Sequence, residues 1–229
     1  IGENGVLYHR FAKGERAIEG FIDDYSYFTF GLVELYEACF NEKYLQASLN
    51  LTKSLTERFL DETDGSFYYS AKSDDESVPR IKQAYDGAVP SGNSVELLNL
   101  LRLARLSGEN ILEEKAHSLL SAFAAEIQTQ PLAHTFMLVG LDFIVGPAFN
   151  VVLVGNLGDL DMMLVLEVLR KNYLPNMVVS IWSEHLLSGY ERIDNKATAY
   201  VCRGQTCMPP TNEVNEMLRL LGLPKNSIS

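Results

Sequence analysis

Polar side chains that can donate, accept or transfer protons gather where three predicted helices begin. Carboxylates and an imidazole can act as acids and bases, whereas hydroxyls and an amide can hold a hydroxylated ligand. We predict acid–base roles for Asp24, Asp86 and His134, and ligand contacts from Tyr25, Ser91, Asn93 and Ser94. Asp24 and Asp86 are the nearest candidates for the two carboxylates that epimerase or glycosidase chemistry requires.

The same residues also have a structural interpretation. Asp23, Asp24 and Ser91 are residue types that cap helix N-termini, because a short oxygen side chain accepts hydrogen bonds from free backbone N–H groups. Asp86 precedes Gly87, so it can fix a turn. Asn93 and Ser94 can satisfy buried backbone groups, and His134 can be a hydrogen-bonded core histidine. The sequence alone leaves both interpretations open.

A shared rim is the geometric condition for a site built from these residues. If the inner helices of two concentric layers run in the same direction, their N-termini lie on one rim and direct positive dipole ends toward one funnel. Such a rim suits a carbohydrate or another polyol-like ligand. Gly155–Gly158 matches no dinucleotide or phosphate-loop pattern, so we predict no cofactor.

Cys202 and Cys207 form the second constellation. Four residues separate them, and the first follows a predicted strand, so a turn can bring them close enough to bridge. They are candidates for a redox disulfide or for half of a metal site, but zinc normally needs four ligands and we predict no metal. The leading interpretation is a close pair of reduced thiols.

Helices with different hydrophobic coverage alternate along the first part of the chain. Residues 23–40, 91–107 and 132–145 are apolar on nearly every face, which predicts buried helices. Residues 42–60 and 109–127 carry one apolar stripe each and are predicted to be surface helices. This alternation favours a partial (α/α) toroid of inner and outer helices over a solenoid of stacked hairpins.

Short apolar segments after Pro147 predict a different architecture. The run 149–154 is typical of a buried parallel strand, and a helix at 157–172 leads to a second strand at 177–181. We expect these strands to be parallel neighbours in a βαβ unit. Further predicted elements are a β-hairpin at 61–71, a strand at 198–202 and a helix at 212–222.

Composition narrows the function classes. A formal net charge of −11 argues against binding to a nucleic-acid backbone or an anionic membrane. The apolar stretch 132–155 is interrupted by Asp142 and by Gly146-Pro147, which argues against a transmembrane helix. Three cysteines are too few for a secreted disulfide framework, and no signal peptide is recognisable. We therefore expect a soluble, cytoplasmic protein.

Three motifs carry a family resemblance. They are Gly20–Tyr25, the stretch Tyr85–Ser94, and Ala199–Cys202 followed by Cys207 and Pro209. In this order the chain resembles the YyaL or spermatogenesis-associated protein 20 family of thioredoxin-domain-containing proteins. The chain has Thr206 before Cys207, where members of the family often have alanine.

The resemblance implies a fold and a set of partners. Members resemble a thioredoxin-like domain followed by a six-hairpin (α/α) toroid of the N-acylglucosamine 2-epimerase type. We therefore expect a mainly α chain, with toroid hairpins in 1–147 and a small α/β subdomain in 148–229. Its partners would be the remaining toroid and the thioredoxin-like module. The first functional hypothesis is a carbohydrate-active enzyme. The alternatives are a redox accessory protein, a non-catalytic scaffold and a ligand-binding module.

Overall fold

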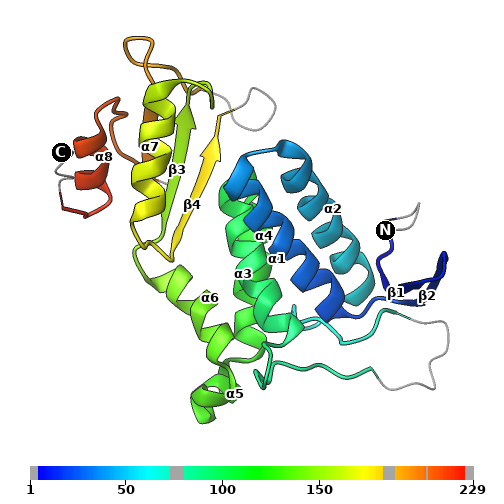
Figure 1. Cartoon of the computed structure of the whole chain (residues 1–229). Helices are drawn as coiled ribbons and strands as arrows, with labels where there is room; N and C mark the ends of the chain where they lie inside the picture. The colour runs from blue at the N-terminus through cyan, green and yellow to red at the C-terminus, as the bar shows by residue number, and fades with distance from the viewer. Residues whose placement is uncertain (1–4, 73–79, 183–188, 205, 225–229) are drawn as a thin grey trace. The chain divides into compact units, whose positions relative to one another are not determined.

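The computed structural model describes residues 5–72, 80–182, 189–204 and 206–224. The chain divides into two compact units, one formed by 1–104 with 109–144 and the other by 105–108 with 145–229. It is mainly helical with a smaller α/β part (Figure 1). The elements wholly or mainly in the first unit are β1 (Tyr8–Ala12), β2 (Glu15–Glu19), α1 (Ile22–Cys39), α2 (Glu42–Phe59), α3 (Gly92–Ser107), α4 (Asn110–Ala122), α5 (Ala124–Thr129) and α6 (Thr135–Val145).

Helix α3 forms the centre of the first unit. Every residue from Ser91 to Ala104 is buried, so this helix has no solvent-facing side over that length. Its leucines supply much of the core, and Leu97, Leu100 and Leu103 are fully buried. The prediction of a helix buried on all sides at 91–107 is confirmed for these residues.

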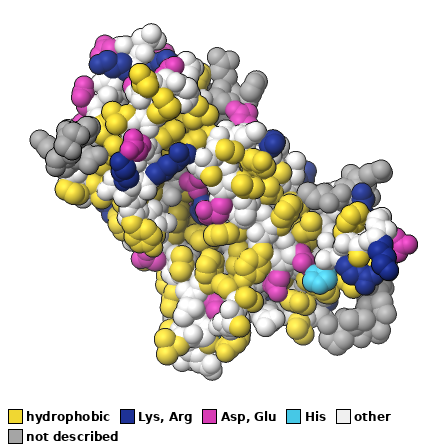
Figure 2. All heavy atoms as spheres, in the orientation of Figure 1, with side chains coloured by type: hydrophobic (Ala, Val, Ile, Leu, Met, Phe, Trp, Pro, Cys, Tyr) yellow, Lys and Arg dark blue, Asp and Glu magenta, His cyan; other side chains and the backbone are white. Residues whose placement is uncertain are grey.

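The same prediction is wrong for α1 and α6. Seven residues of α1 and six of α2 are buried, so the two helices are covered to a similar extent. Phe28 and Leu35 of α1 are 45% and 48% exposed, and Val139 of α6 is 42% exposed. Hydrophobic side chains gather on the face where α1 lies (Figure 2). Helices α1 and α6 carry more apolar side chains than the neighbouring described helices cover. Hydrophobicity alone therefore predicted more burial than the structure shows.

The predicted β-hairpin at 61–71 is a side-chain-stabilised turn. Only isolated bridges form there, between Leu60 and Phe67 and between Tyr68 and Lys82. Gly65 adopts a φ of 81°, which closes the turn. Carboxylates in the turn accept backbone N–H groups, and such local bonds compete with a strand ladder.

Two predicted helices are interrupted, and one hairpin was not predicted. The helix expected at 109–127 breaks at Phe123 between α4 and α5, and the helix expected from 132 begins with a short 3₁₀ turn, Pro131–Ala133, before α6. Strands β1 and β2 pair antiparallel. Lys13 and Gly14 connect them with φ angles of 52° and 82°, which suits a tight hairpin turn.

The second unit is a four-stranded sheet with two helices. Its elements are β3 (Phe149–Val154), α7 (Leu160–Lys171), β4 (Met177–Ile181), β5 (Thr198–Arg203), β6 (Thr206–Cys207) and α8 (Val214–Leu220). The strand order is β4-β3-β5-β6. Strands β3 and β4 are parallel neighbours, which confirms the predicted pairing, and β5 is antiparallel to β3. Helix α7 connects β3 to β4 and lies along the sheet (Figure 1).

The apolar stretch 132–155 is divided between α6 and β3. A loop that contains Gly146 and Pro147 separates the two elements. Among the described residues, no helix combines the length and the apolar character that crossing a membrane requires.

Candidate functional site

Asp86 joins the starts of two helices. Its Oδ1 accepts a hydrogen bond from the Ser91 amide at 2.9 Å, just before α3. Its Oδ2 accepts hydrogen bonds from the amides of Phe136 and Met137, at 2.7 and 3.3 Å, in the first turn of α6. The residue is only 9% exposed. Asp86 therefore caps α3 and α6 together, and this explains its presence without a catalytic role.

Asn93 ties the 61–68 turn to α3. The side chain is fully buried. Its Oδ1 accepts a hydrogen bond from the Phe67 amide at 3.0 Å, and its Nδ2 donates to the carbonyls of Phe67 and Gln83, both at 2.9 Å. These bonds occupy both ends of the amide, so Asn93 is a structural connector.

Ser91, Ser94 and His134 also have internal partners. The two serine hydroxyls lie 2.9 Å apart, and Ser91 Oγ accepts a hydrogen bond from the Ser94 amide at 3.2 Å. His134 is 5% exposed, and its Nδ1 lies 2.8 Å from the Ala84 carbonyl, a distance at which Nδ1–H donates. These contacts satisfy buried polar groups at the starts of α3 and α6.

Asp24 and Tyr25 hold the start of α1. Asp24 Oδ2 accepts a hydrogen bond from the Phe21 amide at 2.8 Å, which is the reciprocal half of a capping box. Both of its oxygens lie 3.0 Å from Nδ1 of His9. Tyr25 is fully buried, and its hydroxyl accepts a hydrogen bond from the Leu7 amide at 2.9 Å. Asp24 is partly exposed, so it is the more accessible of the two.

The starts of α1 and α3 lie side by side. The Asp23 carboxylate accepts a hydrogen bond from the Gly92 amide. A Cβ at Gly92 would lie 2.6 Å from Asp23 Oδ1, so glycine permits this close approach. The Tyr27 hydroxyl donates to the Pro90 carbonyl at 2.8 Å. Through these contacts and those of Asp86, the N-termini of α1, α3 and α6 surround the 83–91 loop.

Asp23 is the residue that the sequence interpretation left out of the site. Desolvation raises the pKa of its carboxyl, the Gly92 amide opposes that rise, and the neighbouring Asp24 adds to it. Burial, followed by the charge of Asp23, also raises the pKa values of Tyr27 and Tyr69. We call the group Asp23, Asp24, Tyr27 and Tyr69 the α1 rim. Adjacent acids at a helix start were a signal for it, but capping explained them equally well.

The α1 rim combines the groups that acid–base chemistry needs. A carboxyl with a raised pKa can keep a proton at a pH where an ordinary carboxyl has lost it. The Asp24 side chain beside it contacts Phe21 and His9 but is 25% exposed, so its oxygens can accept a further hydrogen bond from a ligand. Tyr69 stacks on Phe21 with ring centroids 5.0 Å apart, and Tyr27 is 38% exposed. Among the described residues, no group of His, Cys, Asp and Glu could hold a metal ion.

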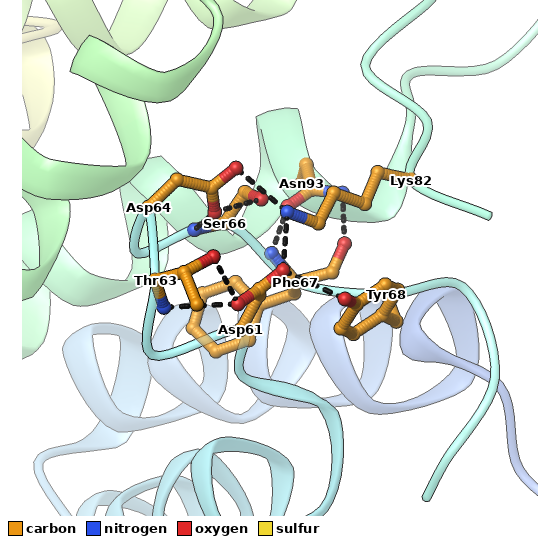
Figure 3. Close-up of polar contacts among 8 residues, drawn as sticks. All are labelled: Asp61, Thr63, Asp64, Ser66, Phe67, Tyr68, Lys82 and Asn93. Carbon is orange, nitrogen blue, oxygen red and sulfur yellow. Dashed lines mark hydrogen bonds and ion pairs between the residues drawn. The ribbon is translucent and has the colours of Figure 1, made fainter. Parts of the chain in front are cut away.

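A second charged cluster organises the 61–68 turn. Lys82 Nζ lies 2.7 Å from Asp61 Oδ2 and 2.6 Å from Asp64 Oδ2 (Figure 3). Asp61 also accepts hydrogen bonds from Thr63 and from the Tyr68 hydroxyl. The bond to Lys82, then those to Thr63 and Tyr68, lower the pKa of Asp61. The cluster fixes the turn that Asn93 attaches to α3.

Replacing Lys82 by methionine is expected to raise the pKa values of Asp61 and Asp64, because the shared ammonium stabilises both charged carboxylates. Methionine keeps an unbranched apolar side chain but removes the ammonium, which also lies 5.0 Å from the centroid of the Tyr68 ring. Carboxyl chemical shifts, followed by NMR against pH, measure the change. Lys43→Met, at an exposed position of α2, is the control. Unchanged titration of Asp61 in K82M would contradict this account of the turn.

Helix α3 also carries a buried acid, Glu96, that no predicted site includes. Burial raises its pKa to about 7, while Asn99, Ser26 and Thr52 oppose the rise. Asn99 Nδ2 donates to Glu96 Oε2 at 3.0 Å and to the Ser26 carbonyl at 2.8 Å. The Ser26 and Thr52 hydroxyls interact with Glu96 and lower its pKa, but among the described residues neither they nor Glu96 Oε1 reach the geometry of a good hydrogen bond. We call these four residues the Glu96 cluster.

The expectation that Cys202 and Cys207 are reduced is wrong in this structure. The two residues are direct partners in the antiparallel β5–β6 register, and a disulfide joins them with Cα atoms 3.9 Å apart. The predicted closeness is therefore confirmed. Register explains the bond, because directly opposed residues bring their side chains to the same face.

Several named proteins are similar in sequence to this chain. The chain is 32% identical to spermatogenesis-associated protein 20 of Homo sapiens over 213 residues, which cover 88% of this chain and 27% of the human protein. The Mus musculus protein of the same name is 31% identical over the same coverage. An uncharacterized protein of Caenorhabditis elegans is 28% identical over 96% of this chain and 30% of its own length.

The chain thus spans less than a third of the length of these relatives. No family model matches it. The name that the human and mouse relatives share is that of the family which the motifs at Gly20–Tyr25 and Tyr85–Ser94 suggested. With 32% identity over 88% of its length, the chain belongs to the spermatogenesis-associated protein 20 family and corresponds to one part of those proteins.

Proposed function

We propose that the chain binds a polyhydroxyl ligand, such as a carbohydrate, at the α1 rim, where Asp23 and Asp24 act as a proton donor and acceptor. The observation that carries the proposal is the pair of adjacent, partly exposed carboxyl groups at the start of α1, and burial raises the pKa of one of them, Asp23. Carboxylates bind hydroxyl groups strongly because charge-assisted hydrogen bonds are about twice as strong as neutral ones.

The rim replaces the acid–base set expected from the sequence. Asp86 and His134 have internal partners and little exposure, so neither carries the proposed chemistry. Asp24 remains, and Asp23 takes the role of the second acid. Tyr85 lies in the same loop as Asp86 and is 59% exposed, which leaves its ring available to stack on a sugar face.

A partial (α/α) toroid is the architecture that we propose around this rim. Central burial of α3 and the exposed apolar face of α1 are consistent with further helices packed beside them. The remaining toroid and a thioredoxin-like module would then be the partners within a longer protein. The chain's limited coverage of its relatives is compatible with this arrangement.

Titration calorimetry against a panel of monosaccharides, oligosaccharides and polyols tests the proposed function. Wild-type protein should bind at least one class, and Asp24→Asn should weaken that binding about tenfold or more, because the charge-assisted bond made by the Asp24 carboxylate contributes about 1.5–3 kcal/mol. Glu62→Gln is the matched control, since Glu62 is exposed in the neighbouring turn. Equal affinities for D24N and wild type would exclude the α1 rim as the binding site.

A non-catalytic scaffold is the second candidate. It is favoured by one observation, namely that Asp86, Asn93, Ser91 and Tyr25 all use their polar atoms in internal hydrogen bonds. A scaffold would bind none of the panel, and D24N would then change only the stability of the start of α1, which Asp24 caps. The same calorimetric experiment, combined with thermal unfolding, separates the two functions.

A further inference from the structure

The disulfide of the second unit joins an exposed cysteine to a buried one. Cys207 lies exposed on β6, at the edge of the sheet, while Cys202 is 4% exposed on β5. A nucleophile from solvent can therefore reach Cys207 and not Cys202. This asymmetry is the arrangement in which one sulfur is attacked and the other leaves.

Backbone hydrogen bonds hold the segment after Cys207 independently of the disulfide. The Met208 amide donates to the Val201 carbonyl at 2.9 Å, and Ala199 and Thr211 exchange hydrogen bonds at 2.8 and 3.0 Å. Thr211 is also buried. Strand β5 thus keeps this segment in place when the sulfurs separate, so the unit can retain its fold in both redox states.

The disulfide also closes a short loop. Cys207 lies five positions after Cys202 in the sequence. A cross-link over a short loop removes less entropy from the unfolded chain than one over a long loop. Stabilisation of the fold is therefore a weak explanation for this disulfide. The exposure of Cys207, in contrast, lets a thiol reach the bond directly.

From this geometry we propose that Cys202 and Cys207 are a reversible redox pair that exchanges with a dithiol reductant through Cys207. This activity is separate from ligand binding at the α1 rim and does not depend on it. The site takes thiols as its substrate class, and the hydrogen-bonded β5 segment keeps the two sulfurs adjacent for reoxidation.

The exchange proceeds in two balanced steps. A thiolate of the dithiol attacks Cys207 Sγ and forms a mixed disulfide, and the electron pair of the broken S–S bond leaves with Cys202 Sγ, which takes up a proton. The second thiol of the reductant then loses its proton, attacks its own mixed-disulfide sulfur and releases Cys207. The dithiol is oxidised to a disulfide, and the protein pair gains two electrons and two protons.

A redox titration of the folded protein tests reversibility. The protein, with Cys39→Ser to remove the exposed free thiol, is equilibrated with mixtures of reduced and oxidised dithiothreitol. Alkylation and mass spectrometry then count its thiols. We expect the same two-electron transition from both directions, with unchanged circular dichroism. A disulfide that resists reduction in the folded state, or reduction that unfolds the second unit, would overturn the proposal.

Single-cysteine variants test which sulfur is attacked. With glutathione disulfide, Cys202→Ser should form a mixed disulfide at Cys207 at least about tenfold faster than Cys207→Ser forms one at Cys202, because reactivity follows exposure. Circular dichroism checks that both variants are folded. Equal rates, or a faster reaction at Cys202, would show that the assignment to Cys207 is wrong.

Discussion

Replacing Glu96 by glutamine is expected to raise the free energy of unfolding by about 3 kcal/mol at pH 8 and to leave it nearly unchanged at pH 4. Burial raises the pKa of Glu96 from 4.5 to about 7. The folded state therefore binds a proton that the unfolded state releases, and stability contributed by Glu96 falls as pH rises from 4.5 to about 7. A difference of one in pKa between the folded and unfolded states corresponds to about 1.36 kcal/mol of stability.

The structure gives glutamine a favourable environment at this position. Its carbonyl can accept the hydrogen bond from Asn99, and its NH₂ group can donate to the oxygens of Ser26 and Thr52, which Glu96 leaves without a partner in hydrogen-bonding geometry among the described residues. Urea unfolding of both proteins from pH 4 to pH 8 measures the difference, and subtraction removes the effects of other carboxyls. Glu57→Gln, at an exposed position of α2, is the control. A difference that does not grow with pH would contradict the assignment.

Replacing Asn93 by alanine is expected to destabilise the first unit by at least about 3 kcal/mol. The change leaves the Phe67 amide and the carbonyls of Phe67 and Gln83 without their partner. Each buried backbone group left without a hydrogen bond costs about 1–3 kcal/mol. Urea unfolding followed by circular dichroism measures the loss, and the 61–68 turn should separate from α3 first.

Two further variants make this result specific. Asn50→Ala removes a single exposed bond to Gln46 on α2 and should change stability by less than about 0.5 kcal/mol. Asn93→Asp can still accept from the Phe67 amide but cannot donate, so its loss should lie between those of the other two variants. Equal stability of N93A and N50A would show that these three contacts contribute nothing.

Local sequence signals predicted the elements most accurately where one strong force dominates. Strands β3 and β4 were predicted at their observed bounds because their apolar runs are short and β-branched, which favours a strand over a buried helix. The ends of α1, α2 and α3 were within about one residue of those predicted, since polar starts and helical periodicity agree there. The segment after Asp61 was predicted as a hairpin, whereas carboxylates that bind backbone amides and Lys82 hold it as a turn. A hydrophobic pattern does not reveal such bonds.

Long-range partners account for the remaining differences at the site. Sequence located the polar helix starts, but it could not show that Asp86 spans two of them or that Asn93 holds a segment 26 positions away. Asp23 differs from Asp24 only in its surroundings, since Gly92 approaches one carboxyl and Phe21 the other. Such distinctions depend on tertiary contacts between elements that are distant in the chain. The type of a single residue does not reveal these contacts.

The position of α3 also determines how the molecule exchanges hydrogen with deuterated water. All side chains from Ser91 to Ala104 lie among other helices and turns, so solvent reaches these amides only when the packing around them opens. Amides of the exposed faces of α1 and α2 can exchange through smaller local fluctuations. The slowest deuterium uptake in α3 would therefore report the complete unfolding of the first unit, and the buried strand β3 would give the corresponding signal for the second.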